Sequence, residues 1–263
     1  MLDIVLDISA AHQLFYILIF CLDLGEVIDL VFAIEGTERM KQDGFDEAKE
    51  FIKNMIDEYT ISEPGTHVGI VEYSDEPIIT IRLQDWFDEN TIKGVVNVMR
   101  ASEGKTANLD RALEKAADKM FSVAMGGRPS AKKILVVIAA SNTTAKEALK
   151  KASKPLKERG VRVYVIALGD EADPEILKEI TPDETKVTKV KDKKKFPKLA
   201  EKIAKLIDDD LVNSTRDLSV FLSVCFCLSL SVFFPLLSRQ TLFCLLINLF
   251  ASLHVIKSFI VSF

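Results

Sequence analysis

The middle of this 263-residue chain lacks cysteine altogether and contains a single histidine, His67. No disulfide and no Cys/His set can therefore form within residues 28–212, and His67 is the single histidine that a Ser/His/Asp set could use there. Gly-x-Gly-x-x-Gly and Walker-type phosphate loops are missing as well. These absences argue against an enzyme. The four cysteines all lie in the flanking segments and are Cys21, Cys225, Cys227 and Cys244.

An excess of positive charge is also missing. Residues 28–212 hold 31 basic and 34 acidic side chains, a net charge of −3, so nothing points to a nucleic-acid partner. Residues 1–27 and 213–263, in contrast, contain only four charged side chains each. The composition divides the chain into an apolar N-terminal segment (1–27), a charge-rich domain (28–212) and an apolar tail (213–263).

Both apolar ends have two interpretations. Leu14–Leu22 has the length of the hydrophobic part of a signal peptide, but no Lys or Arg precedes it, so it is an atypical signal or the product of a mis-set start. Leu218–Ser238 carries no charge over 21 residues, which is long enough to span a bilayer. The competing interpretation of the tail is mistranslated sequence, because charge disappears abruptly and no polar tail follows.

The domain itself alternates between strand and helix patterns. Short apolar runs predict buried strands, and most are followed by an amphipathic helix, which is typical of an α/β fold. We predict a doubly wound, mainly parallel six-stranded sheet with helices on both faces and one antiparallel edge strand from the pair 67–73 and 77–83. We expect the helix over 144–159 to kink or restart at Pro155 and to end at Gly160. Further helices are predicted over 43–59, 91–99, 109–121, 174–180 and 196–211, and strands over 30–34, 133–140, 161–168 and 186–190.

The polar loop after the first strand is the natural place for a site. It begins at Glu35 and runs through Thr37, Glu38 and Arg39. Open α/β sheets bind ligands at the carboxyl ends of their strands. On an exposed loop, Glu35 and Glu38 are expected to form surface ion pairs. His67 opens a strand with no second His or Cys nearby, so we expect it to face solvent.

Residues 28–211 resemble a von Willebrand factor type A domain. The resemblance rests on the stretch 28–40, on the strand His67–Ser74, on the threonine loop Gly104–Leu113 and on the segments Gly127–Lys133 and Arg159–Gly169. Together these segments are specific, although each alone would be weak. The resemblance implies the α/β sheet described above and a binding function.

In that family, three loops hold a divalent cation, usually Mg²⁺, and the first loop reads Asp-x-Ser-x-Ser. The corresponding residues here are Glu35, Thr37 and Arg39 in the first loop, Thr106 in the second and Ala140 in the third. Glu35 is longer than Asp, Arg39 would place an uncompensated cation beside the metal, and Ala140 lacks the expected carboxylate. We therefore expect a degenerate metal site that needs no cofactor. The alternative is Mg²⁺ bound with a substitute carboxylate, from Asp110 or Asp170.

The resemblance implies a non-catalytic protein-binding module of extracellular-matrix or cell-surface type, independent of metal. Its partner would be collagen or another matrix protein, and 218–238 would provide a membrane anchor. The alternatives are a Mg²⁺-dependent adhesion domain and a purely structural matrix module. Asn142 and Asn213 begin Asn-x-Thr sequons and are candidate glycosylation sites if the protein is secreted.

Overall fold

The computed structural model describes residues 27–142, 144–181, 183–192 and 195–213. The chain divides into two compact units, Met1–Lys205 and Leu206–Phe263, and the sheet belongs to the first. The predicted signal segment and the predicted span 218–238 lie outside the described residues. Within the described ranges, no helix is long and apolar enough to cross a membrane.

Six strands form one sheet in the order β3-β2-β1-β4-β5-β6. Every neighbouring pair is parallel except β2 with β3, which confirms the predicted mainly parallel sheet with one antiparallel edge strand. The strand order reverses between β1 and β4, and such a reversal opens a crevice at the carboxyl ends of the two strands. The strands are β1 (Ile28–Glu35), β2 (His67–Tyr73), β3 (Ile78–Ile81), β4 (Lys132–Ala139), β5 (Arg162–Leu168) and β6 (Val187–Val190).

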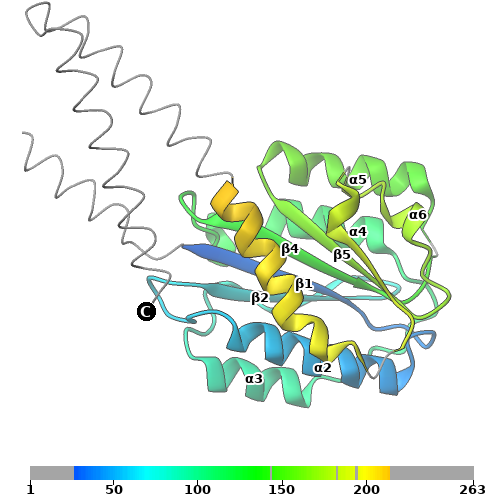
Figure 1. The fold of residues 1–263 in the computed structure, drawn as a ribbon, viewed down its shortest axis with the longest axis horizontal. Coiled ribbons are helices and arrows are strands. Elements are labelled where there is room, and N and C mark those ends of the chain that lie inside the picture. The colour runs from blue at the N-terminus through cyan, green and yellow to red at the C-terminus, as the bar shows by residue number, and fades with distance from the viewer. Residues whose placement is uncertain (1–26, 143, 182, 193–194, 214–263) are drawn as a thin grey trace, which may run out of the picture. The chain divides into compact units, whose positions relative to one another are not determined.

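Helices cover both faces of the sheet, which explains why the central strands are apolar throughout (Figure 1). All eight residues of β1 are buried. Side chains alternate along a strand, so Val31 and Ala33 face the core beneath α4 and α5. Leu30 and the other even-numbered residues of β1 face α2 on the opposite side of the sheet. On that second face the rings of Phe51 and Phe196 stack with their centroids 4.5 Å apart. The helices are α2 (Lys41–Asp57), α3 (Glu89–Val98), α4 (Leu109–Lys115), α5 (Lys146–Glu158) and α6 (Pro174–Leu177), and residues 200–213 are also helical.

Two helix predictions need correction. The predicted helix 109–121 is regular only as far as Lys115, and Ala116–Met120 continues as a π-helical turn. Helix α5 runs unbroken through Pro155 to Glu158, so it does not restart there, because the buried side chain of Leu156 holds the following turn against the core. The alternative, a kink at Pro155, stays a prediction. The expected end of α5 at Gly160 is confirmed. Gly160 has a φ of +69°, and Val161 donates its backbone N–H to the carbonyl of Leu156 at 2.9 Å.

At the amino ends of the strands, a buried ion pair joins β1 to the loop before β4. Asp29 is fully buried, and it accepts hydrogen bonds from the backbone N–H of Arg128 at 2.8 Å and from its Nε at 2.9 Å. The prediction that His67 faces solvent is wrong. Its side chain is buried beside Phe87, with ring centroids 4.6 Å apart, and its Nε2 lies 2.8 Å from the carbonyl oxygen of Glu63.

Candidate functional site

Glu35 lies at the centre of the carboxyl ends of the strands, and its position differs from the sequence prediction. It is the last residue of β1 and is fully buried, so it forms no part of an exposed loop. The predicted surface ion pair of Glu35 is therefore wrong. The apolar run of β1 ends one residue earlier in the sequence than the strand does in the structure, because the glutamate finds polar partners inside the fold.

Four hydrogen bonds occupy both carboxylate oxygens of Glu35. Its Oε1 accepts from the hydroxyl of Thr37 at 2.6 Å and from the hydroxyl of Ser141 at 2.7 Å. Its Oε2 accepts from the backbone N–H groups of Ala140 at 2.8 Å and Ser141 at 3.0 Å. All these donors are neutral and belong to the chain itself. The side chain of Glu35 thus connects the end of β1 to the loop after β4, across the point where the strand order reverses.

Ser141 belongs to this site, although its sequence pattern predicts no role for it. Its hydroxyl and its N–H both reach Glu35, although the two residues are 106 positions apart. The sequence feature that could have identified Ser141 is a hydroxyl residue directly after the apolar run that forms β4. This feature points to Glu35 only when β1 and β4 are known to be neighbouring strands.

Tyr73 supports the same region from β2. Its hydroxyl donates to the carbonyl oxygen of Ile138 at 3.0 Å. Burial raises the pKa of Tyr73 well above 10, and the nearby charge of Glu35 raises it further. The phenol therefore stays protonated and keeps donating its hydrogen bond over the whole physiological pH range.

Arg39 turns away from Glu35. Its Nη1 lies 3.0 Å from Oε2 of Glu171, in the loop after β5, and both side chains are more than half exposed. The expectation of an uncompensated Arg39 cation is therefore wrong. Asn142 joins the same cluster by donating from Nδ2 to the carbonyl oxygen of Glu171 at 3.1 Å. The loops after β1, β4 and β5 are thus connected, although an exposed pair such as Arg39 with Glu171 adds little stability.

Thr106 lies on the neighbouring loop, where its backbone N–H donates to Asp75 at 2.8 Å. That hydrogen bond is the largest cause of the lowered pKa of Asp75. The Thr106 loop adjoins the first loop through Gly104, whose carbonyl oxygen accepts from the N–H of Glu38 at 3.0 Å. Thr106 itself is exposed, and its hydroxyl bonds to Asp75. The structure therefore brings Thr37 and Ala140 directly to Glu35, while Thr106 lies one loop away and Arg39 points elsewhere.

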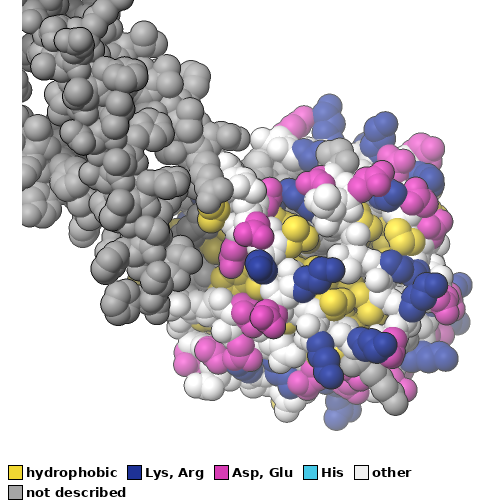
Figure 2. All heavy atoms as spheres, viewed as in Figure 1, with side chains coloured by type: hydrophobic (Ala, Val, Ile, Leu, Met, Phe, Trp, Pro, Cys, Tyr) yellow, Lys and Arg dark blue, Asp and Glu magenta, His cyan; other side chains and the backbone are white. Residues whose placement is uncertain are grey.

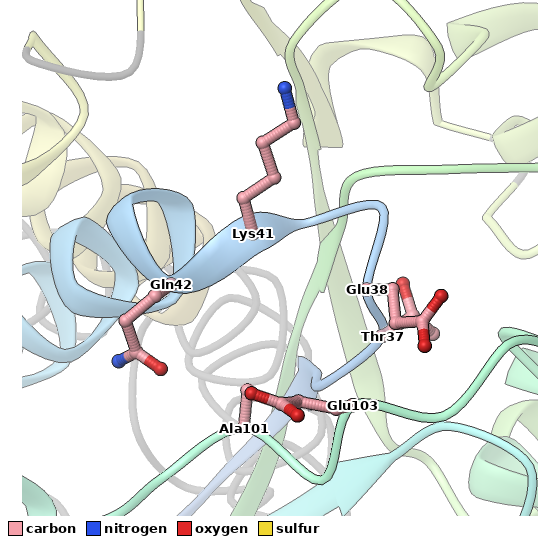
Figure 3. Close-up of a pocket in the computed structure, with 6 residues that line it drawn as sticks. All are labelled: Thr37, Glu38, Lys41, Gln42, Ala101 and Glu103. Atoms are coloured by element: carbon pink, nitrogen blue, oxygen red, sulfur yellow. The ribbon is translucent and has the colours of Figure 1, made fainter.

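A shallow depression of about 190 Å³ lies between the first loop and the 101–108 loop (Figure 3). Lys41 and Glu103 both line it and have positive φ angles of 59° and 55°. Figure 3 shows the Lys41 side chain directed away from Glu103. The depression is smaller than the roughly 300–1,000 Å³ of small-molecule pockets, so this surface suits contact with a macromolecule better than enclosure of a small ligand. The remaining lining residues are Thr37, Glu38, Gln42 and Ala101.

The donors at this site do not fit a Mg²⁺ ion. Mg²⁺ requires near-octahedral oxygen ligation anchored by carboxylates. Here the only carboxylate at the end of β1 already accepts four hydrogen bonds, and Ala140 offers none. Asp170 is exposed in the loop after β5, and Asp110 lies in the first turn of α4. Across the described ranges, no group of three or more His, Cys, Asp or Glu side chains is placed to hold a metal.

The sheet is doubly wound, its strand order reverses between β1 and β4, and polar loops follow these strands. These features define an α/β protein with a candidate site at the carboxyl ends of its strands. The family model of the von Willebrand factor type A domain matches residues 29–202, and the chain belongs to this family. The resemblance noted in the sequence is thereby confirmed.

Relatives with this domain include matrilin-1 of Gallus gallus, which is 29% identical over 159 residues, covering 60% of this chain and 31% of matrilin-1. The collagen alpha-4(VI) chain of Mus musculus is 25% identical over 160 residues, covering 60% of this chain and 7% of the relative. Among solved structures, proximal thread matrix protein 1 from the mussel byssus superimposes with a TM-score of 0.65 at 21% identity, covering 69% of this chain and 48% of that one. The chain thus matches about a third of matrilin-1 and a smaller part of the collagen chain.

Proposed function

We propose that this protein is a non-catalytic protein-binding module of the extracellular matrix or cell surface that binds its partner without a metal. The partner would be collagen or another matrix protein. Three observations support this: membership of the von Willebrand factor type A family, the similarity to a matrilin and a collagen VI chain, and the polar loops at the carboxyl ends of the strands.

The single observation that carries the metal-independent function is the hydrogen bonding of Glu35. A metal-binding glutamate would need at least one free oxygen facing the ion, whereas both oxygens here accept two hydrogen bonds each. Binding a cation would break bonds from the Thr37 and Ser141 hydroxyls or from two backbone amides. The chain's own donors thus do the work that a metal does in holding the loops together.

Catalysis finds no support in the same geometry. The one described histidine, His67, begins β2 and so lies at the opposite end of the sheet from Glu35. Seven residues of strand separate its end of β2 from the loops above the sheet, a distance of roughly 20 Å. It is also held by Phe87 and the carbonyl of Glu63, so it has no route to a substrate at those loops.

Thermal unfolding with excess Mg²⁺, with Mn²⁺ and with a chelator tests the metal-independent site. We expect the three melting temperatures to coincide. A cation present at about 100 times its dissociation constant would stabilise the fold by ~2.7 kcal/mol, which is several degrees for a domain of this size. An upward shift with Mg²⁺ that Thr37→Ala abolishes would contradict the proposal and favour the Mg²⁺-dependent alternative.

Binding to immobilised fibrillar collagen tests the proposed partner and the surface together. We expect retention of the protein to be equal in Mg²⁺ and in chelator. Thr106→Arg should reduce it about tenfold or more, because a bulky cation at an exposed position of the loops obstructs a protein contact. Ser130→Arg is the matched control, since Ser130 is exposed in the loop before β4, at the amino ends of the strands.

Equal loss of collagen binding in both variants would place the contact elsewhere on the domain. Absence of collagen binding in the unchanged protein, with other matrix proteins also failing to bind, would favour the purely structural module.

A further inference from the structure

Helix α5 carries a row of lysines along its solvent face. With 3.6 residues per turn, Lys146, Lys150, Lys154 and Lys157 fall within roughly 80° of arc and extend about 16 Å along the helix. We call these four residues the lysine stripe. All four are exposed, whereas the opposite side of α5 packs into the core through Leu149, Ala152 and Leu156. Figure 2 shows Lys and Arg side chains, interspersed with Asp and Glu, along the upper edge of the domain, where Figure 1 places α5.

The lysine stripe is not neutralised within the described part of the chain. Lys154 lies 3.8 Å from Glu158, and the other three lysines of the stripe have no acidic partner among the described residues. On the α6 side, Glu175 is already engaged by Lys178 at 2.8 Å. Helix α5 holds five lysines against two glutamates, while the rest of residues 28–212 has 26 basic and 32 acidic side chains. Helix α5 thus carries a local excess of positive charge in a domain that is acidic as a whole, as does the separate lysine-rich stretch 186–198.

This arrangement opposes the stability of the helix itself. Like charges four residues apart repel, as Lys146 with Lys150 and Lys150 with Lys154 must do. Lys146 is also the first residue of α5, where the helix dipole disfavours a cation. Glu147 in the first turn and the Lys154–Glu158 pair offset part of these costs, but Lys146 and Lys150 have no acidic partner within the described part of the chain. Residues that lower the stability of the element they belong to often form part of a functional surface.

The composition of the exposed face of α5 limits the classes of ligand that it can bind. Helix α5 contains no aromatic residue, and its larger apolar side chains are buried. Single-stranded nucleic acids need aromatic side chains for stacking, membrane-surface helices need an apolar face, and protein interfaces depend on buried aromatic or Arg anchors. A face of flexible lysines alone matches a ligand recognised by its charge density. We propose that the lysine stripe is a binding surface for a sulfated polysaccharide, separate from the loops at the carboxyl ends of the strands.

Salt-dependent binding of the purified full chain to heparin, used as the sulfated probe, tests this proposal. We expect retention near the physiological salt concentration of about 0.15 M, with affinity falling as salt rises. The double variant Lys150→Ala/Lys157→Ala removes the centre and one end of the stripe. It should lower the slope of log affinity against log salt by roughly two and the affinity by about tenfold or more.

The matched control is Lys151→Ala/Lys202→Ala. Both lysines are exposed on helices, and the change in net charge is the same. Lys151 belongs to α5 but lies beyond Glu147 and Glu158, roughly 100° round the helix from the middle of the stripe. We expect this control to keep most of the affinity, and circular dichroism melts should show both variants folded.

Three results would overturn the proposal. The first is failure of the unchanged protein to bind heparin near 0.15 M salt, and the second is equal loss of affinity in the stripe and control variants. The third is stripe-dependent binding to poly-L-glutamate or to phosphatidylserine vesicles as tight as to heparin, which would assign the surface to an acidic protein or to a membrane. We expect the stripe variant to bind collagen as the unchanged protein does. The heparin proposal and the proposed collagen contact can therefore fail independently of each other.

Discussion

Replacing Glu35 with alanine is expected to lower the free energy of unfolding by about 4 kcal/mol. The change removes a fully buried carboxylate and leaves the hydroxyls of Thr37 and Ser141 and two backbone N–H groups without an acceptor. Each unsatisfied buried donor costs about 1–3 kcal/mol, and the cavity adds to that cost, while relaxation of the loops recovers part. Urea unfolding followed by circular dichroism measures the loss.

Glu35→Gln is the informative control. Its carbonyl oxygen can accept from the N–H groups of Ala140 and Ser141, and its amide can donate to the two hydroxyls, which rotate to accept. We therefore expect a loss of roughly 1–2 kcal/mol, well below that of the alanine variant. A loss below about 1 kcal/mol for Glu35→Ala would show that the carboxylate does not hold the loops, and the main support for the metal-independent function would go with it.

Replacing Arg128 with alanine is expected to cost about 3–5 kcal/mol. The side chain is only 19% exposed, and it pairs with Asp29, which is fully buried in β1. In the variant, the Asp29 carboxylate would lose the guanidinium group and keep only the hydrogen bond from the backbone N–H of residue 128. Because Asp29 is buried, water cannot solvate this carboxylate. It would also lose the hydrogen bond from Nη2 to the carbonyl oxygen of Ile28 at 2.7 Å.

The comparison for this variant is Arg82→Ala. Arg82 pairs with Asp85 at 2.9 Å, a similar distance, but its side chain is 51% exposed, so its loss should cost no more than about 1 kcal/mol. If urea unfolding shows that the two arginine variants lose similar free energies of unfolding, burial does not account for the stabilising effect of the Asp29 pair. Because the pair lies at the amino ends of the strands, we expect Arg128→Ala to shift stability without changing collagen binding under conditions where the protein stays folded.

Glu35 and Ala140 differ from the residues of the family's metal-site pattern, and the two differences affect each other. The longer glutamate at position 35 reaches the loop after β4, where its Oε2 accepts the N–H of Ala140, the residue that replaces the expected third-loop carboxylate. An aspartate in that third loop would place a second negative charge beside Glu35. The two departures from the family pattern are therefore compatible with each other. In the proposed metal-independent site, one carboxylate and neutral donors would take the place of two carboxylates and a cation.

Local pattern was sufficient for most of the fold. The predicted strand 67–73 coincides with β2, the predicted strand 133–140 differs from β4 by one residue at each end, and Gly160 ends α5 as expected. These features depend on short-range signals, namely apolar runs of strand length and a glycine in the left-handed conformation. The antiparallel edge also followed from local pattern, because only a short connection joins β2 to β3.

The site was less predictable, because its contacts join distant residues. The sequence by itself determined the α/β architecture, the family and which polar residues follow the first and central strands, since these depend on periodicity and on residue types along the chain. Only the tertiary structure decided that Glu35 is buried with Ser141 as its partner, that Arg39 pairs with Glu171, and that His67 is covered by Phe87. Each of these pairs joins residues 20 or more positions apart, and their contact depends on strand order and loop packing that no local pattern encodes.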